Sequence, residues 1–110
     1  MLTRRLRLVI ALTVVLVAVS AVTAIASSTK TVSVADSYYG PKTLTVGRGT
    51  KVTWKWTGVL KHNVVVHTGP AFFSSKTQVR GSYSHVFTKK GTYALVCTVH
   101  PKMKMTVVVR

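Results

Sequence analysis

The chain has 110 residues and a formal net charge of +15 at pH 7, because 16 residues are Lys or Arg and a single residue, Asp36, is acidic. Such a charge attracts acidic proteins and anionic lipid headgroups. The alternative explanation is that the charge only keeps the protein soluble. Nucleic acid is excluded as a partner because the basic residues are scattered singly and no helix-turn-helix or zinc-finger pattern occurs. With one acidic residue to act as a general base, an enzyme is disfavoured.

Residues 1–26 have the pattern of a secretory signal peptide. Three arginines within the first seven residues precede an apolar run, and residues 24–26, Ala-Ile-Ala, form a small-x-small cleavage site. This pattern predicts cleavage after Ala26 and export to the periplasm or to the outer face of the cytoplasmic membrane. The alternative is an uncleaved membrane anchor, because the apolar run from Leu8 to Ala26 has 19 residues and a helix of about 20 apolar residues spans a bilayer.

The remaining 84 residues, 27–110, are enough for one small domain and too few for two. Exported domains of this size are often stabilised by disulfides, but this one contains a single cysteine, Cys97, and cannot form an internal disulfide. A buried free cysteine that packs as a small hydrophobic residue is the simplest explanation for Cys97. Its neighbours in the sequence favour a different explanation.

Short alternating runs separated by turn residues indicate β-structure throughout this domain. In the segment 51–56, Val52, Trp54 and Trp56 fall on one face and polar residues on the other, as in a half-buried strand. Gly and Pro residues supply the breaks between runs. The fold class is therefore all-β, and we expect a Greek-key β-sandwich of about seven strands. The predicted strands cover residues 31–35, 43–46, 51–56, 63–68, 83–88, 92–97 and 106–109.

Residues with metal-binding chemistry occur in two places. Cys97, His100 and Met103 lie in one short loop between the last two predicted strands, and His62 precedes an earlier strand. A thiolate, two imidazole nitrogens and a weak thioether form the trigonal set with an axial sulfur that suits copper cycling between Cu(I) and Cu(II). Three donors in one loop require a fourth from elsewhere, and His62 is the natural candidate. A closed set of four ligands leaves no open coordination position, which again disfavours an enzyme.

The pattern C-x-x-H-x-x-M near the end of the chain and the isolated His-Asn upstream resemble the cupredoxins, in particular the plastocyanin and amicyanin group. The resemblance covers residues 27–110 and includes the segments PKTLTVGRGTKVTWKW, KHNVVVH, FTKKGTYALVCTVHPKM and MTVVVR. It implies that His62, Cys97 and His100 are the strong copper ligands, Met103 the axial ligand, and Asn63 a residue that steadies the Cys97 region. It also implies an exported type 1, or blue, copper protein that carries single electrons between redox partners.

Met105 is an alternative axial ligand. Met103 lies six residues after Cys97 and Met105 eight residues after it, and both loop lengths occur in the cupredoxins. We favour Met103 because it lies four positions before the valine run that begins at Val107, as in the amicyanin-like loop. Met105 is then expected at the start of the last strand, where it packs beneath the site as a core residue.

The sequence departs from the family at Lys61 and Val99, which stand before the two histidines where proline is often found. Val99 keeps a backbone N–H that proline lacks. If this N–H points at the sulfur of Cys97, it stabilises the electron-rich thiolate of the Cu(I) state and raises the reduction potential. The positive charge of Lys61 acts in the same direction, so we expect a relatively high potential.

His67 and His85 are expected to have structural roles. His67 is five residues after His62, so the two side chains point to opposite faces of a strand and cannot share a metal ion without a bulge. His85 shares a strand face with Tyr83 and Phe87, which favours packing among these rings.

We expect a monomer that passes electrons to an acidic redox partner docking near His100. Val59, Leu60 and Pro101 provide an apolar rim for a weak interface suited to fast turnover. The lysines expected to steer this partner are Lys61, Lys102 and Lys104. An anionic membrane surface is a further candidate partner. Two rival functions are a carrier or scavenger that passes copper on, and a metal-free β-sandwich module that binds anionic surfaces.

Overall fold

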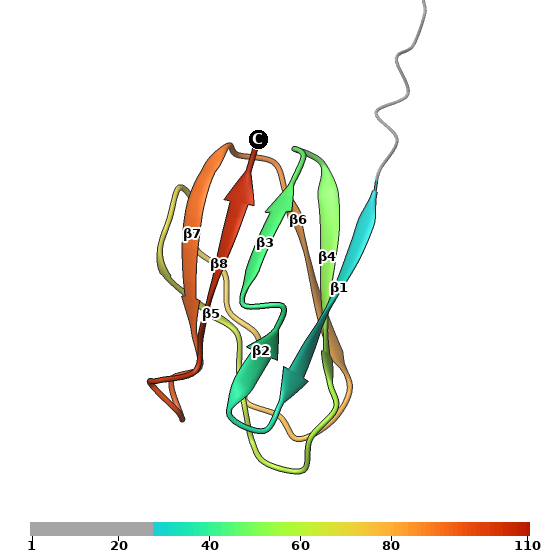
Figure 1. Ribbon diagram of the computed structural model, residues 1–110, viewed down its shortest axis with the longest axis vertical. Helices are drawn as coiled ribbons and strands as arrows, with labels where there is room; N and C mark the ends of the chain where they lie inside the picture. The colour runs from blue at the N-terminus through green and yellow to red at the C-terminus, as the bar shows by residue number, and fades with distance from the viewer. Residues whose placement is uncertain (1–27) are drawn as a thin grey trace, which may run out of the picture.

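The computed structural model describes residues 28–110 (Figure 1). The predicted signal peptide or anchor, residues 1–26, lies outside these residues. Among residues 28–110, no helix is long and apolar enough to cross a membrane. The described chain forms eight strands: β1 (Thr29–Ala35), β2 (Tyr38–Gly40), β3 (Thr43–Val46), β4 (Thr50–Trp56), β5 (Val65–Thr68), β6 (Ser82–Phe87), β7 (Gly91–Val96) and β8 (Lys104–Val109).

The strands form two four-stranded sheets that face each other (Figure 1). The first sheet has the order β2-β1-β4-β6 and the second the order β3-β8-β7-β5. Within them β1 pairs with β4, and β3 with β8, in parallel, whereas the other pairs are antiparallel. From β4 to β7 the chain changes sheet at every connection, so apart from the neighbours β1–β2 and β7–β8 the paired strands are distant in sequence. This arrangement confirms the predicted all-β sandwich.

The space between the sheets is filled by the alternate residues of each strand. On β4, Val52, Trp54 and Trp56 are buried whereas Lys51 and Lys55 are exposed, as the alternation in the sequence predicted. The same two-residue period buries one face of β7 and of β8. Burial of these apolar side chains in the core therefore stabilises the domain, which has no disulfide. Its largest fully buried side chains are Trp54, Tyr39, Tyr93, Phe87, Leu95 and Met103.

Sequence analysis missed one strand, β2, which lies outside all of the predicted strands. Asp36 and Ser37 connect β1 to β2 as a two-residue hairpin loop, with Ala35 opposite Tyr38. Ser37, the second residue of this loop, has a positive φ of 69°, which is uncommon for a residue with a side chain. The hairpin buries the ring of Tyr39 in the core, and its hydroxyl donates a hydrogen bond to the backbone carbonyl of Asn63. A short run before Gly40-Pro41 is thus a strand because Tyr39 anchors it.

A cluster of rings closes the side of the sandwich near β6. His85 stacks on Phe73 with ring centroids 3.8 Å apart and meets Phe87 edge-on at 5.0 Å. Phe73 in turn lies 5.9 Å from the indole of Trp54. These contacts confirm that His85 packs with aromatic side chains, and they attach the 69–81 loop to the first sheet.

Protonation of His85 is expected to destabilise the fold. Burial lowers the pKa of His85 below its usual value of 6.5. The unfolded chain therefore takes up this proton at a higher pH than the folded protein does, so stability is lost as the pH falls below about 6.5. The free energy of unfolding of metal-free protein, measured in urea from pH 7.5 to pH 5, should decrease less for His85→Gln than for the wild type. His67→Gln, which replaces an exposed histidine, is the control for the substitution itself; a His85→Gln profile parallel to that of the wild type would contradict the assignment.

Candidate metal centre

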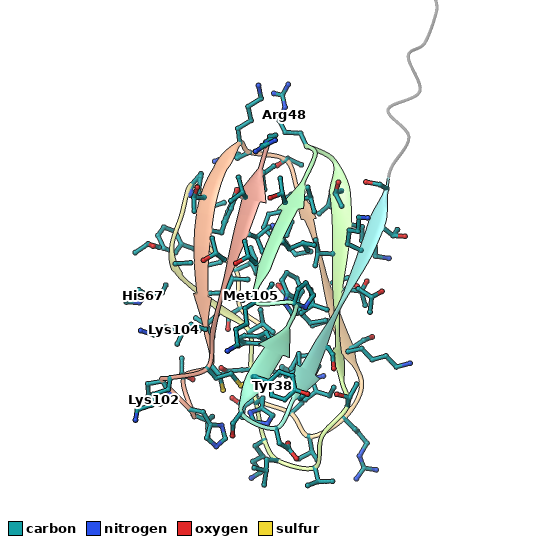
Figure 2. All side chains as sticks on the ribbon, viewed as in Figure 1. Tyr38, Arg48, His67, Lys102, Lys104 and Met105 are labelled. Carbon is teal, nitrogen blue, oxygen red and sulfur yellow. The ribbon has the colours of Figure 1, made fainter. Side chains whose placement is uncertain are left out.

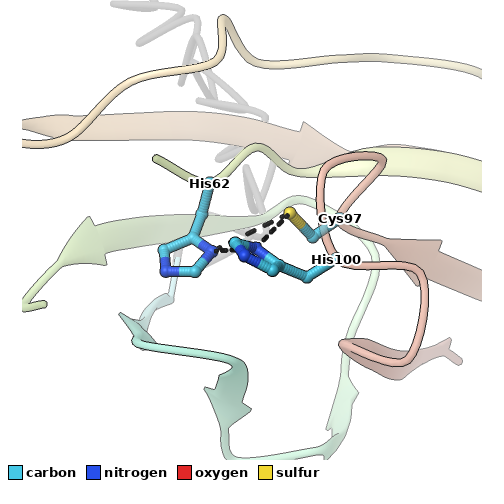
Figure 3. Close-up of side chains that lie close together, drawn as sticks. All are labelled: His62, Cys97 and His100. Atoms are coloured by element: carbon cyan, nitrogen blue, oxygen red, sulfur yellow. Dashed lines mark hydrogen bonds between the residues drawn. The ribbon is translucent and has the colours of Figure 1, made fainter. Parts of the chain in front are cut away.

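The structure brings His62, Cys97 and His100 together at one end of the sandwich (Figure 3). The Sγ of Cys97 lies 3.9 Å from the Nδ1 of His62 and 3.9 Å from the Nδ1 of His100, and the two nitrogens are 3.1 Å apart. His62 and Cys97 are fully buried and His100 is half-buried. Two segments separated by 35 residues thus place three donor atoms face to face.

The backbone of His62 is held by the loop that follows β5. His62 and Gln78 form an antiparallel bridge in which each N–H donates to the other's carbonyl at 3.0 Å. The indole N–H of Trp56 donates to the same His62 carbonyl at 3.1 Å. The strand predicted to start at Asn63 begins two residues later, at Val65, because the backbone groups of Val64 are bonded to Ser75 in the 69–81 loop. His62 therefore sits in a fixed position between two strands.

The ring of His62 is oriented by Asp36, the only acidic side chain in the chain. The Nε2 of His62 lies 3.0 Å from Oδ1 of Asp36. An ionised carboxylate only accepts hydrogen bonds, so Nε2 carries the proton and Nδ1 keeps a lone pair that points at Cys97 and His100. A carboxylate behind a histidine is a common support for a metal ligand, since it fixes the tautomer and strengthens the donor nitrogen.

Asp36 is itself held by the 57–60 turn. Its carboxylate accepts hydrogen bonds from the N–H groups of Val59 and Leu60 at 3.0–3.1 Å. The backbone N–H groups of Leu60 and Val59, followed by the bond to His62, hold the pKa of Asp36 below its ordinary value. A Cβ at Gly58 would overlap the carboxylate, so only glycine allows the turn to close this tightly around Asp36. Sequence analysis did not assign Asp36 to the site. The feature that could have indicated it is the occurrence of a single acidic residue in an otherwise basic chain, at the turn after β1.

The Cys97–Met103 loop is closed by its own backbone. The N–H of Cys97 donates to the carbonyl of Met103 at 3.0 Å, that of His100 to Cys97 at 3.2 Å, and that of Met103 to His100 at 2.8 Å. Three hydrogen bonds within seven residues bring the loop back on itself. This turn places the side chains of Cys97 and His100 on the same side, as Figure 3 shows.

Asn63 ties the two halves of the site together. Its side-chain oxygen accepts the Thr98 N–H at 2.8 Å, and its amide NH₂ donates to the hydroxyls of Thr98 and Thr77 at 2.7 and 3.0 Å. The side chain of Asn63 is buried, whereas its partners Thr77 and Thr98 are exposed, so the Asn63 amide is the end of these bonds that is removed from water. Asn63 follows His62 directly and Thr98 follows Cys97 directly. The bonds between Asn63 and Thr98 thereby set the spacing between the two segments.

The three donor atoms form a triangle of the size that one metal ion needs. A point in the plane of this triangle about 2.05 Å from both nitrogens is about 2.2 Å from the sulfur, close to ordinary metal–imidazole and metal–thiolate distances. Two imidazoles and one thiolate in a trigonal arrangement are the donor set of blue copper sites. The residues therefore fit copper as they stand.

Comparison with known proteins agrees with this donor set. The model of the copper-binding proteins of the plastocyanin/azurin family matches residues 26–110. The chain belongs to this family. Copper is the metal that its members bind, and His62, Cys97 and His100 are arranged as a type 1 copper site. The resemblance to the cupredoxins inferred from the sequence is confirmed, together with their fold.

Individual cupredoxins resemble the chain over most of its length. Amicyanin-alpha of Methylorubrum extorquens is 35% identical over 85 residues, which are 71% of this chain and 69% of that protein. A reduced Cu(I) form of an amicyanin variant at pH 4 has a TM-score of 0.68 and 33% identity, covering 78% of this chain and 86% of the amicyanin. The copper-containing nitrite reductase from Thermus scotoductus SA-01 has a TM-score of 0.69 and 30% identity over 74% of this chain. This chain spans only 22% of that enzyme.

The two methionines of this cupredoxin lie in different surroundings. Both are buried, with 2% of Met103 and 3% of Met105 exposed. The Sδ of Met105 lies 3.3 Å from the indole nitrogen of Trp54, whose N–H it accepts in the core. Met103 ends the closed loop and, with His100, lines a hollow at the end of the sandwich. The sulfur of Met105 is thus engaged by the core, whereas Met103 belongs to the loop that carries Cys97 and His100.

Val99 and His67 are not members of the group of donor residues. Among the described residues, the hydrogen bonds of the Cys97 sulfur reach only the two histidines, and the Val99 N–H that was expected there is not among its donors. The turn instead places Val99 at its outer corner, where 47% of the residue is exposed. His67 is exposed on β5, which is consistent with a side chain directed away from His62. Val99 is therefore a rim residue in this structure.

Replacing Asn63 is expected to loosen the site and the fold together. Asn63→Ala removes three hydrogen bonds and leaves the Thr98 N–H without its partner, so the free energy of unfolding of the metal-free protein should fall by about 2 kcal/mol. Thr77→Val is the matched control, because it removes one of these three bonds and should have about half the effect. Urea unfolding measures both, and an Asn63→Ala protein as stable as the wild type would contradict the role of this residue.

Proposed function

We propose that the protein is an exported blue copper protein that carries single electrons between redox partners. In this proposal one copper ion is held by His62, Cys97 and His100, with Met103 as the axial ligand, and it cycles between Cu(I) and Cu(II). The observation that supports it most directly is the triangle of donor atoms, with sides of 3.9, 3.9 and 3.1 Å, built by a chain of the plastocyanin/azurin family.

The bound copper supplies the one-electron chemistry, and the protein supplies a site that changes little between the two oxidation states. His62 is held by its backbone bridge to Gln78 and by Asp36 behind its ring. The Asn63–Thr98 hydrogen bonds fix Cys97 relative to His62. Donors held from both sides have little freedom to rearrange, and a small rearrangement is what fast electron transfer requires. A carrier that must release copper needs a more open site than this buried one.

The end of the sandwich around His100 is the proposed docking surface. His100 is the most exposed of the three donor residues, and Val99 and Pro101 line a hollow with it. In the turn that bonds Asp36 behind His62, 77% of Val59 and 47% of Leu60 are accessible. Pro101 is exposed beside His100. Figure 2 shows Lys102 and Tyr38 at this same end. The lysines proposed to steer an acidic partner are Lys61, Lys102 and Lys104, which are all exposed. The high positive charge opposes self-association, so we propose that the carrier acts as a monomer.

Export is supported by the N-terminal sequence. The basic start, the apolar run and the Ala-Ile-Ala site of residues 1–26 favour a signal peptide, which leaves residues 27–110 as the copper-binding domain. The same residues also support an uncleaved anchor. Either form places the domain in the periplasm or at the outer face of the cytoplasmic membrane. A lone thiol that serves as a metal ligand is compatible with that oxidising environment.

Addition of Cu(II) to the purified protein is expected to produce an intense blue colour, because charge transfer from the Cys97 thiolate to the metal absorbs visible light strongly. Cys97→Ser should abolish this absorption. Cyclic voltammetry should show a reversible one-electron wave, which separates an electron carrier from a copper scavenger. Rapid loss of copper to a weak chelator would favour the scavenger, and a colourless protein that folds equally well without metal would favour the metal-free anionic-surface module.

Leucine substitutions at the two methionines are expected to have different effects. Met103→Leu removes the axial sulfur, whose donation favours the more highly charged Cu(II), so the reduction potential should rise. Met105→Leu should leave the potential near the wild-type value but lower the free energy of unfolding by about 1 kcal/mol, because the Trp54 N–H loses its acceptor. Voltammetry and urea unfolding of both variants measure the two effects. The reverse pattern would assign the axial position to Met105.

A further inference from the structure

The end of the sandwich opposite the copper site is built from segments that backbone hydrogen bonds hold together. The N–H of Arg48, in the β3–β4 turn, donates to the carbonyl of Arg110 at 3.0 Å. Gly49 donates in the same way to Phe87, at the end of β6, and Lys51 donates to Ser28. Figure 1 shows the end of β8, the β3–β4 and β6–β7 turns and the start of β1 at this end, and Figure 2 shows Arg48 there, far from Lys102. We call this end the basic pole.

The basic pole carries positive side chains and no acidic one within the described residues. Arg48 and Arg110, with Gly49 and Thr88, line a hollow at its surface. Lys89 and Lys90 follow Thr88 in the adjacent turn, and all four basic side chains are exposed. The single acidic side chain, Asp36, lies at the copper end, where it is bonded to His62. Within the described residues, the charges of the basic pole therefore have no carboxylate side chain beside them.

The chain enters the folded domain at the basic pole. The hydroxyl of Ser28 is hydrogen-bonded to that of Thr50 at 2.9 Å, and the Ser28 carbonyl accepts the N–H of Lys51. Residues 1–27, which include the apolar run from Leu8 to Ala26, are therefore joined to the domain at this end. If that run remains in a bilayer, only Ser27 and Ser28 separate it from β1, and the basic pole is the part of the domain nearest the membrane.

We propose that the basic pole docks on an anionic lipid surface and leaves the copper end directed towards the aqueous space. Arginine forks match the phosphate oxygens of lipid headgroups in pairs, and lysines add point charges that negatively charged membranes attract. An acidic protein is a weaker candidate for this surface, because most of the large exposed apolar side chains, which form the centre of a protein interface, belong to the copper end: Tyr38, Val59, Leu60 and Val99 lie there, whereas Phe72 and Val86 are the two that do not. The two ends would then bind a membrane and a redox partner at the same time.

Co-sedimentation of the full chain with lipid vesicles tests this proposal. The vesicles contain either phosphatidylcholine alone or phosphatidylcholine with 30% phosphatidylglycerol, at 0.1 M salt. The pole variant replaces Arg48, Lys89, Lys90 and Arg110 with Gln. The control variant replaces Lys61, Lys76, Lys102 and Lys104 with Gln, so it has the same net charge. All three proteins share residues 1–27, so differences between them report the folded domain alone.

The proposal predicts that the wild type prefers the anionic vesicles and that the pole variant loses at least tenfold of this preference, since each basic side chain near an anionic surface contributes about fivefold. The control variant should lose less than threefold. Equal losses in both variants would show that net charge alone drives binding, and an unchanged pole variant would also overturn the proposal.

Because all eight replaced side chains are exposed, thermal unfolding should confirm that both variants fold. The double variant Lys89→Gln/Lys90→Gln provides a milder test. Vesicle binding needs no copper, so this result is separate from that of the copper test.

Discussion

The site depends on one connection, the set of hydrogen bonds between the Asn63 side chain and Thr98. The donor atoms of His62 and Cys97 come from segments 35 residues apart. The distance between these atoms therefore depends on the contacts that join the two backbone segments. Asn63 makes this join with both ends of its amide, which accepts a backbone N–H and donates to a hydroxyl of the same residue. The side chain of Asn63 is buried, and a buried amide that loses part of its hydrogen bonds is costly. The spacing of the donors is therefore a property of the folded sandwich.

Asp36 imposes the second constraint on the site, and it is the single acidic residue of a strongly basic chain. A carboxylate in a strongly basic protein has many lysines available to it, yet Asp36 is bonded to two backbone N–H groups and to His62. These bonds arise from the β1–β2 hairpin on one side and the turn at Gly58 on the other. The tautomer of His62 thus depends on the loop of the β1–β2 hairpin, which carries Asp36. The direction of its free lone pair towards Cys97 follows from that contact.

Much of the fold and the site could be predicted from local patterns. The alternation of Val52, Trp54 and Trp56 placed β4 correctly, and the spacing of Cys97 and His100 located the loop that carries two of the three donors. Contacts distant in sequence could not be predicted in this way. β2 is a strand because Tyr39 reaches the carbonyl of Asn63, and Asp36 faces His62 only after β1 and β4 have paired in register. No feature within a few residues of Asp36 or Tyr39 indicates these partners.

The two ends of the sandwich differ in the surface that they offer, although both are basic. At the copper end the carboxylate of Asp36 is used internally, and the turn that it holds exposes Val59 and Leu60. The arrangement that orients His62 therefore also exposes two apolar side chains at the copper end. At the basic pole no acidic side chain organises the turns. Backbone hydrogen bonds hold them, together with the Ser28–Thr50 and Tyr93–Lys89 bonds, and the basic side chains are exposed. The one carboxylate side chain thus stands at the end with the exposed apolar residues, and the other end carries only positive side-chain charges, so the two ends suit partners of different chemistry.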